Sequence, residues 1–216
     1  MLELGGKFLI SYFIGSLMGA MIIGRLRGGV DIRTMGSGNA GGTNALRTQG
    51  WVFALGVMII DVGKGAIAAG VVPSMGLPFL VADPQVSRTW LVLACAGAAI
   101  IGHVWPIWHR FRGGKGAATA IGTLTVLAPG LIIPIILVWA SVLTLSGYVG
   151  LSTIIASASA PLYLLATRWP QAQPLLIFCS MLALFMIFTH RSNIARMRDG
   201  TEVRNERLMI FRKSGR

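Results

Sequence analysis

Residues Trp51–Val72 read WVFALGVMIIDVGKGAIAAGVV, an apolar run whose only charged residues are Asp61 and Lys64. A helix needs about 20 residues of this kind to cross a bilayer. Charged groups at that depth are costly unless they pair with each other or line a site. Asp61 and Lys64 stand three residues apart and so share a helix face, which predicts an ion pair inside the membrane. A catalytic role for Asp61 is the alternative.

Six further stretches of the chain are comparably apolar. The whole sequence is 54% hydrophobic and 12% charged over 216 residues, a balance that excludes an ordinary soluble domain. We predict an all-α integral membrane protein, one polytopic domain with about seven transmembrane helices, or five as the alternative. The short stretches must borrow flanking small residues or lie buried among neighbours. The six are Phe8–Gly24, Trp90–Ile101, Ala117–Pro129, Leu131–Leu145, Val149–Ala166 and Pro174–Thr189.

Three polar blocks stand between these apolar stretches. They read SGNAGGTNALR at Ser37–Arg47, GHVWPIWHRFRGGKGAATA at Gly102–Ala120 and HRSNIARMRDGTE at His190–Glu202. Polar groups at membrane depth, or at the membrane edge, are costly unless they line a site. Three such blocks in one hydrophobic chain therefore predict a functional site.

The basic residues are distributed unevenly over the connecting loops. With seven spans, only Lys7, Arg88 and Arg168 fall on one side, whereas most other Lys and Arg residues fall on the opposite side. Cytoplasmic loops carry an excess of these residues. We therefore expect the N-terminus outside, all three polar blocks on the cytoplasmic face, and a short basic cytoplasmic tail at 205–216. The net charge of +12 then indicates a lipid bilayer and small anionic substrates as partners, and not nucleic acid.

The second block contains a glycine-rich turn, FRGGKGAAT, just before an apolar stretch. Such a turn can open a helix whose first N–H groups, positive dipole end and neighbouring lysine together form a phosphate cradle. The Walker A spacing is missing, so nucleoside triphosphate binding is not expected. We expect His103, at the start of the block, to be structural or near the site. The binding candidates of the block are His103, Gly113, Gly114, Lys115, Gly116 and Thr119.

The first and third blocks supply further candidates for substrate binding. Hydroxyl and amide groups can hydrogen-bond a polyol, and the planar fork of an arginine suits a phosphate. His190 and Asn193 stand three residues apart, so on a helix they share one face and both are expected to contact substrate. Lys64 is a further binding candidate. The first block contributes Ser37, Asn39, Thr43, Asn44 and Arg47.

No cofactor or metal site is expected. The histidines are not paired with carboxylates at metal-ligand spacing, and Cys95 and Cys179 lie in apolar stretches where neither a disulfide nor a zinc site is indicated. The sequence lacks a Gly-x-Ser-x-Gly elbow. None of the histidines is followed five residues later by an aspartate, the pair expected of thioester-using glycerolipid acyltransferases. No feature requires a protein partner.

The blocks carry three patterns in order: Ser-Gly-Asn-x-Gly-x-Thr-Asn-x-x-Arg, Gly-His-x-x-Pro-x-x-x-x-Phe-x-Gly-Gly-Lys-Gly-x-Ala-Thr and His-x-x-Asn-Ile-x-Arg. With the Asp61-to-Gly65 run, these patterns resemble the bacterial acyl-phosphate:glycerol-3-phosphate acyltransferases of the PlsY type over nearly the whole chain. One departure is Ala40, where that family usually has proline. The alanine replaces no contacting side chain, so the resemblance stands.

The resemblance implies transfer of a fatty acyl group from acyl phosphate to the 1-hydroxyl of sn-glycerol 3-phosphate, giving lysophosphatidic acid and phosphate. It implies a bacterial cytoplasmic (inner) membrane. For this reaction we expect Ser37, Arg47, Lys115 and His190 to be catalytic. The base is either His190 or a substrate phosphate, and the resemblance favours the phosphate. A membrane carrier for an organic phosphate is the alternative function, because transporters also build anion sites from broken helices.

Overall fold

The structure, a computed structural model, describes residues 1–76 and 82–210. Within these ranges the regular structure is entirely helical, which confirms the prediction of an all-α protein. The chain divides into two compact units, Met1–Pro129 and Gly130–Arg216. Whether the chain acts as one polytopic domain stays a prediction.

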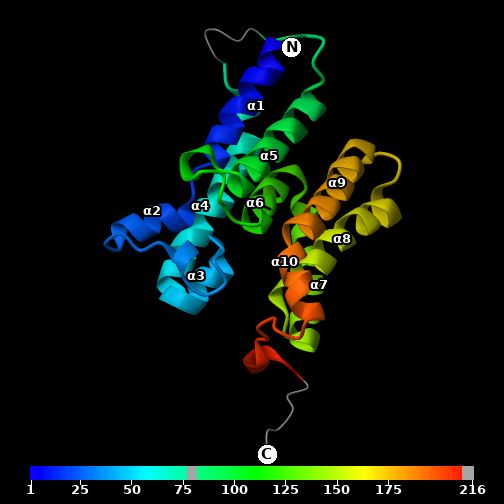
Figure 1. The fold of residues 1–216 in the computed structure, drawn as a ribbon. Helices are drawn as coiled ribbons and strands as arrows, with labels where there is room; N and C mark the ends of the chain where they lie inside the picture. The colour runs from blue at the N-terminus through cyan, green and yellow to red at the C-terminus, as the bar shows by residue number, and fades with distance from the viewer. Residues whose placement is uncertain (77–81, 211–216) are drawn as a thin grey trace, which may run out of the picture. The chain divides into compact units, whose positions relative to one another are not determined.

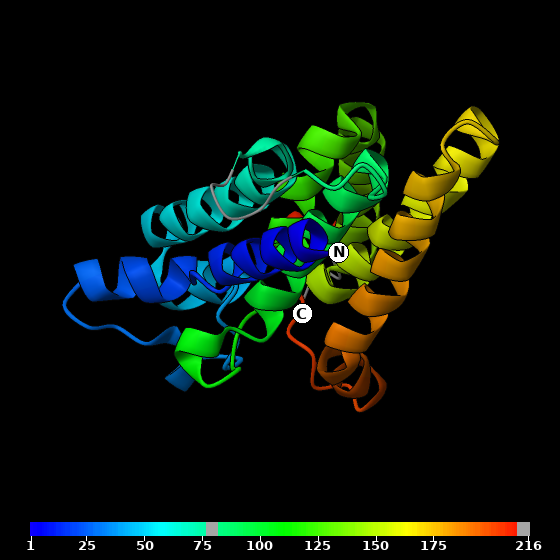
Figure 2. The same ribbon diagram turned by 90° about the horizontal axis from the view of Figure 1, so that it is seen from above.

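The first unit is built around α4 and α5. Helix α1 packs against α5, and α4 packs against both α5 and α6; Figures 1 and 2 show these helices from two directions. Short 3-10 turns, η1 (Ile32–Thr34), η2 (Val72–Ser74) and η3 (Ile107–His109), lie in the connecting segments. The α-helices described in this unit are α1 (Leu2–Gly15), α2 (Gly19–Leu26), α3 (Gly42–Gln49), α4 (Trp51–Gly70), α5 (Arg88–Val104) and α6 (Ala117–Leu127).

The second unit is a set of packed helices. Helix α8 contacts both α7 and α9, and α10 contacts α8 and α9. Figures 1 and 2 both show α8 and α9 side by side. The helices described here are α7 (Ile132–Ser146), α8 (Val149–Arg168), α9 (Gln173–Thr189) and α10 (Arg191–Arg198), with 3-10 turns η4 (Pro129–Leu131) and η5 (Glu206–Leu208).

The beginning of the predicted tail is tied to the end of α7. Helix α7 ends at Ser146, and its C-cap residue Gly147 has a φ of 76°, the left-handed conformation that favours glycine. The N–H of Asn205 donates to the carbonyl of Gly147 (2.8 Å), and that of Ile210 donates to the carbonyl of Thr144 (3.0 Å). These bonds satisfy carbonyls that a helix end leaves without partners. Residues 211–216 of the predicted tail lie outside the described part.

All seven apolar stretches lie on helices. Among the described residues, four helical segments are long and apolar enough to cross a membrane, or up to six if each bent pair counts as one span. The bent pairs are α1 with α2, at 41°, and α9 with α10, at 52°. Helix α6 has 11 residues, which reach about 16 Å at the α-helical rise. The numbers of seven or five spans, and their orientation, stay predictions.

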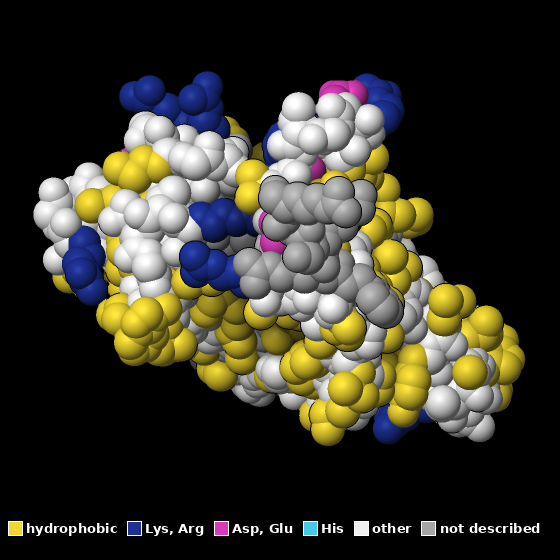
Figure 3. Space-filling view, turned by 90° about the horizontal axis from the view of Figure 1, so that it is seen from below, with side chains coloured by type: hydrophobic (Ala, Val, Ile, Leu, Met, Phe, Trp, Pro, Cys, Tyr) yellow, Lys and Arg dark blue, Asp and Glu magenta, His cyan; other side chains and the backbone are white. Residues whose placement is uncertain are grey.

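Large hydrophobic side chains are exposed on the long helices. Ile59 on α4 is 64% exposed, Ile133 on α7 is 70% exposed and Leu184 on α9 is 68% exposed. In Figure 3 hydrophobic side chains cover much of the visible surface, beside separate groups of Lys and Arg. Apolar faces of this extent mark contact with lipid or with a partner, and lipid contact agrees with a membrane protein.

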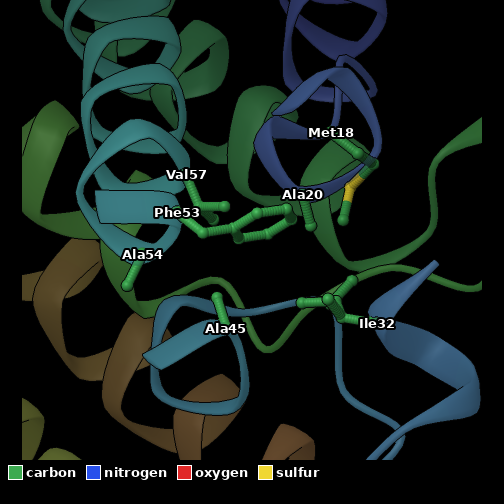
Figure 4. Packing of buried hydrophobic residues seen from close by; sticks show 8 residues of the cluster. Met18, Ala20, Ile32, Ala45, Phe53, Ala54 and Val57 are labelled. Atoms are coloured by element: carbon green, nitrogen blue, oxygen red, sulfur yellow. The ribbon is translucent and has the colours of Figure 1, made fainter. Parts of the chain in front are cut away.

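A buried hydrophobic cluster holds the segment between α2 and α3 against α4. Figure 4 shows the ring of Phe53 reaching from α4 toward Ala20 of α2. Because α3 and η1 contribute to the same cluster, the segment that carries the first polar block is anchored at both ends. The members are Met18, Ala20, Ile32, Ala40, Ala45, Phe53, Ala54 and Val57.

Glycines allow the helices of the first unit to approach to backbone contact. A methyl group added at Gly65 of α4 would collide with the backbone of α6, and one at Gly122 of α6 would collide with the backbone of α4. Gly15 of α1 and Gly102 of α5 stand in the same reciprocal relation. Small residues of this kind let membrane helices pack closely. The short helix α6 is therefore held against α4, as the sequence analysis requires of a short stretch.

Gly65→Ala is expected to destabilise the protein, because the added methyl group has no room against α6. Overpacking of a tight contact typically costs about 1–3 kcal/mol. The matched control is Gly63→Ala on the same helix, where a methyl group meets nothing within 4 Å. Since alanine favours a helix over glycine by up to ~1 kcal/mol, the control should be neutral or slightly stabilising. Thermal unfolding in detergent measures both, and equal melting temperatures would contradict the packing.

Candidate functional site

Asn44 of α3 organises the loop of the first polar block. Its side chain is buried, and Nδ2 donates to the carbonyls of Ile32 (2.9 Å), Met35 (3.0 Å) and Asn39 (2.9 Å). Its Oδ1 accepts the backbone N–H of Ser37 at 3.0 Å. The two N–H groups of the side-chain amide are shared among the three carbonyls, and its oxygen is the acceptor. Asn44 therefore holds the loop in shape through hydrogen bonds to backbone groups of four of its residues.

The remaining candidates of the first block present their polar groups more openly. Ser37, Thr43 and Arg47 are exposed, and the last two lie four residues apart on one face of α3. Asn39 is half-buried, and its Oδ1 has no hydrogen-bond partner among the described residues. A buried acceptor without a donor costs free energy. This oxygen is therefore suited to receive a hydrogen bond from a ligand.

Arg33 of η1, which precedes the first block, joins that segment to the second block. Its guanidinium donates to both carboxylate oxygens of Asp31, the shortest bond being 2.7 Å. This pairing holds the pKa of the Asp31 carboxyl below its ordinary value. Nη1 of Arg33 also donates to the carbonyls of His109 (3.5 Å) and Arg112 (3.4 Å). The turns η1 and η3 are thus held together within the first unit.

The glycine-rich turn folds back onto the end of α5. The N–H of Gly113 donates to the carbonyl of Val104 at 3.2 Å, and the N–H of Gly114 donates to the carbonyl of His103 at 3.1 Å. A methyl group at Gly113 would collide with the same His103 carbonyl. Gly113 and Gly114 are therefore required because the backbone of the turn lies too close to the end of α5 for a side chain to fit.

The turn also opens α6, as the sequence analysis expects. Gly116 is the N-cap residue with a φ of 90°, and no side chain of the described residues caps the helix there. Uncapped N–H groups and the positive dipole end favour an anion, and Lys115 directly precedes them. Thr119, in the first turn of α6, is fully buried, and its hydroxyl has no hydrogen-bond partner in the described chain. These are the elements of the predicted phosphate cradle.

The expected ion pair between Asp61 and Lys64 is present and buried, with Oδ1 and Nζ 2.9 Å apart. Nζ of Lys64 also donates to the carbonyl of Leu17 (2.6 Å) and lies 2.8 Å from Nδ1 of His103. The N–H of Gly19 donates to Oδ1 of Asp61 at 3.1 Å. Both binding candidates, Lys64 and His103, are therefore engaged by protein groups.

In the second unit, the third block forms a network around Glu202. Oε1 of Glu202 accepts from Nδ2 of Asn193 at 2.7 Å, and Oε2 accepts from Nε of Arg196 at 2.6 Å. Asn193 packs against Gly150 of α8, where an added methyl group would come within 2.9 Å of the amide side chain. The amide of Asn193 is thereby held in one orientation.

His190 stands at the bend between α9 and α10 and is 5% exposed. Its Nδ1 lies 2.8 Å from the carbonyl of Met186. A carbonyl only accepts hydrogen bonds, so Nδ1 carries a proton in this contact, and in the neutral ring Nε2 is then the acceptor nitrogen. His190 and Asn193 lie in the same unit, both buried, with His190 at the N-cap of α10 and Asn193 within that helix.

A second buried ionic network, at the start of α1, was not predicted from the sequence. Glu3 is 1% exposed and accepts from Lys7 (2.9 Å) and from both Nη atoms of Arg88 (2.6 and 2.7 Å). Lys7 also donates to the carbonyl of Pro73 at 2.6 Å. The four-residue spacing of Glu3 and Lys7 within an apolar helix was the available signal. This network ties α1 to α5 and η2.

Asn44→Asp is expected to disorder the first block, because a carboxylate would replace the donor amide among three carbonyl oxygens. Leaving buried groups unpaired costs about 1–3 kcal/mol each, so the melting temperature should fall and trypsin should cut faster at Arg33 and Arg47. Gln49→Glu on α3 is the matched control, since it makes the same chemical change but removes only a 3.3 Å bond from Nε2 to the Met35 sulfur and none of the bonds of Asn44. Equal effects of both substitutions would exclude the role assigned to Asn44.

Comparison with known proteins identifies the family. The family model described as glycerol-3-phosphate acyltransferase matches residues 6–200. The glycerol-3-phosphate acyltransferase of Salinibacter ruber is 42% identical over 206 residues, covering 90% of this chain and 89% of the relative. That of Chlorobaculum tepidum is 39% identical over 230 residues, covering 95% and 97%.

Two crystal structures of PlsY (YgiH), described as an integral membrane glycerol 3-phosphate acyltransferase, share the fold. Its glycerol 3-phosphate form has a TM-score of 0.77 at 30% identity, and its lysophosphatidic acid form has 0.78 at 32%. Each comparison covers 93% of this chain and 94% of the other. They confirm an integral membrane protein and the resemblance drawn from the three blocks. The chain belongs to the glycerol-3-phosphate acyltransferase family.

Proposed function

We propose that this chain transfers a fatty acyl group from acyl phosphate to the 1-hydroxyl of sn-glycerol 3-phosphate, yielding lysophosphatidic acid and inorganic phosphate. The observation that carries the proposal is the glycine-rich turn with Lys115 before the uncapped N-terminus of α6, in a chain of this family. An acyl phosphate is a mixed anhydride with a good leaving group. The protein then needs to position two phosphates, polarise the carbonyl and bring the hydroxyl near it.

Residues of the first unit serve the acyl donor. Gly113–Thr119 bind its phosphate through backbone N–H groups and the dipole of α6. Arg47 and Lys115 offset the negative charge that develops on the leaving phosphate. Ser37 contacts the reacting groups, and Oδ1 of Asn39 accepts a hydrogen bond from a substrate hydroxyl. Thr43 and Asn44 shape the loop that presents them.

His190 and Asn193 of the second unit hold glycerol 3-phosphate. The Nδ1 contact of His190 with the Met186 carbonyl supports an Nε2 that accepts a hydrogen bond from a substrate hydroxyl. A phosphate oxygen of a substrate takes the proton during the reaction, so His190 orients the nucleophile and does not act as its base. The Glu202 network keeps Asn193 in position for the same ligand.

We place the enzyme in the bacterial cytoplasmic (inner) membrane with its polar blocks facing the cytoplasm. The excess of Lys and Arg in the loops that carry these blocks supports this orientation. Glycerol 3-phosphate is then supplied from the cytoplasm, and the fatty chain of the donor enters from the bilayer.

Purified protein is expected to form lysophosphatidic acid and phosphate in equal amounts from palmitoyl phosphate and glycerol 3-phosphate, and to form none from palmitoyl-CoA. Lys115→Met and Arg47→Gln should each lower kcat/KM by about 100-fold, the usual effect of removing one charged contact to a developing negative charge. Thin-layer separation of labelled lipid together with a phosphate assay measures both products.

A folded protein that forms no product from either donor would contradict the proposal. Exchange of labelled glycerol 3-phosphate across proteoliposomes without acylation would instead establish the carrier.

His190→Gln is expected to raise the KM for glycerol 3-phosphate by about 10-fold while kcat stays within about 5-fold of wild type, because glutamine can still accept a hydrogen bond near the Nε2 position. Loss of a general base lowers the rate by about 10²–10⁴-fold. A fall of that size in kcat at saturating substrate would make His190 the base and overturn the substrate-assisted route. Steady-state kinetics with each substrate varied in turn separates the two outcomes.

A further inference from the structure

His103 lies where the buried Asp61–Lys64 ion pair meets the glycine-rich turn. Its side chain is 2% exposed, and its Nδ1 is 2.8 Å from Nζ of Lys64. On the opposite edge of the ring, a methyl group added at Gly114 would collide with Nε2. The backbone of His103 also accepts the N–H of Gly114. One residue of α5 therefore contacts the ion pair with one edge and the turn with the other.

The ion pair determines which imidazole nitrogen carries the proton. The ammonium of Lys64 has three N–H groups, and its acceptors are the Leu17 carbonyl, Oδ1 of Asp61 and Nδ1 of His103. An ammonium only donates, so Nδ1 of His103 is the unprotonated nitrogen and the ring proton is on Nε2. Oδ1 of Asp61 lies 3.5 Å from Nδ1, farther away than Nζ of Lys64, and a doubly protonated ring would place a second positive charge against Lys64. The result is a neutral ring whose Nε2–H edge faces Gly114.

The glycine-rich turn is packed directly on this ring. Gly114 is buried, and side-chain atoms of His103 are all three of the nearest atoms that a methyl group there would meet. Lys115 and the N-terminus of α6 follow the contact at once. A rotation of the ring would therefore displace the backbone N–H groups that open α6 and weaken their hydrogen bonds to a bound phosphate.

We propose that His103 is a positioning residue for the phosphate-binding turn, and that Asp61 and Lys64 hold its ring in the orientation and tautomer that the turn requires. The proposal rests on the phosphate-binding role proposed for the turn. It reassigns Lys64 and His103 from substrate contact to support of the residues that make the contact. Burying an ion pair in the membrane costs free energy, and this pair then serves to hold the ring of His103.

Two substitutions of His103 distinguish the contact of its Nδ1 edge with Lys64 from the contact of its Nε2 edge with the turn. His103→Asn keeps an acceptor near the Nδ1 position for Lys64 but leaves the turn without its ring. His103→Gln places an amide near the Nε2 position and keeps contact with the turn. We expect His103→Asn to raise the KM for acyl phosphate at least 10-fold while kcat stays within 3-fold of wild type. For His103→Gln we expect both KM and kcat to stay within 3-fold of wild type. Unchanged KM values in His103→Asn, or equal effects of the two variants, would overturn the proposal.

A double-mutant cycle tests the contact itself. Gly114→Ala should lower the melting temperature in the wild-type background, and much less when His103→Asn has removed the ring atoms that the methyl group meets. Gly113→Ala is the matched control, because its methyl group meets the His103 backbone carbonyl and the Pro106 ring, which His103→Asn leaves in place. Non-additivity at Gly114 with additivity at Gly113 supports the contact, and additivity at both excludes it.

The tautomer has its own measurement. Nitrogen-15 spectra of histidine-labelled protein distinguish a protonated from an unprotonated ring nitrogen, and the signal lost in His103→Asn identifies His103 among the three histidines. We expect the proton on Nε2. A proton on Nδ1, or on both nitrogens, would overturn the role given to Lys64.

The proposal can also be tested if the wild type forms no product. The rise in melting temperature caused by inorganic phosphate then reports affinity without turnover. We expect His103→Asn to weaken this affinity at least 10-fold and His103→Gln to preserve it. That result with an inactive wild type would refute the acyl transfer proposed above and support the positioning role, whereas equal affinities would refute the positioning role.

Discussion

In a bilayer every backbone N–H and C=O group needs a partner within the protein, and the break between α1 and α2 removes the helical partners of such groups. The Asp61–Lys64 ion pair supplies new ones, because Lys64 donates to the carbonyl of Leu17 and Asp61 accepts from the N–H of Gly19. The pair therefore stabilises the 41° bend from α1 to α2. Together with the cluster around Phe53, that bend sets where the first polar block begins.

A buried ion pair is weak evidence for stability, because desolvation offsets most of its attraction. Two apolar residues could fill the same volume. Two apolar residues could not donate a hydrogen bond to the Leu17 carbonyl, which the helix break leaves without a helical partner, and they could not orient His103. Both roles need the N–H groups of Lys64. The close approach of α4 to α6 and of α1 to α5, which the interhelical glycines allow, brings these groups within hydrogen-bond distance. We infer that the main role of the ion pair is to fix the helix break at Leu17 and the orientation of His103, and not to add stability.

Local pattern in the sequence was sufficient for the helices, the ion pair and the turn that opens α6. Each follows from apolar length, three-residue spacing or glycine chemistry. The number of spans could not be predicted from the sequence. It depends on the bends at Leu17 and His190 and on the short helix α6, and tertiary contacts determine all three. The same holds for Asn44, whose three carbonyl acceptors come from segments that only the fold brings around it. Glu3 was missed since its partner Arg88 is 85 residues away.

The break between α1 and α2 also bears on how the protein is made. The partners of Gly19 and Leu17 follow them by 42 and 47 residues in the chain. A nascent chain that exposes only its first two helices still lacks Asp61 and Lys64, which bind these backbone groups in the folded protein. We infer that the first segment stays an unbroken helix, or stays at the water interface, until α4 has been made. Biosynthesis of this fold thus has a required order, in which a later helix completes the insertion of the first.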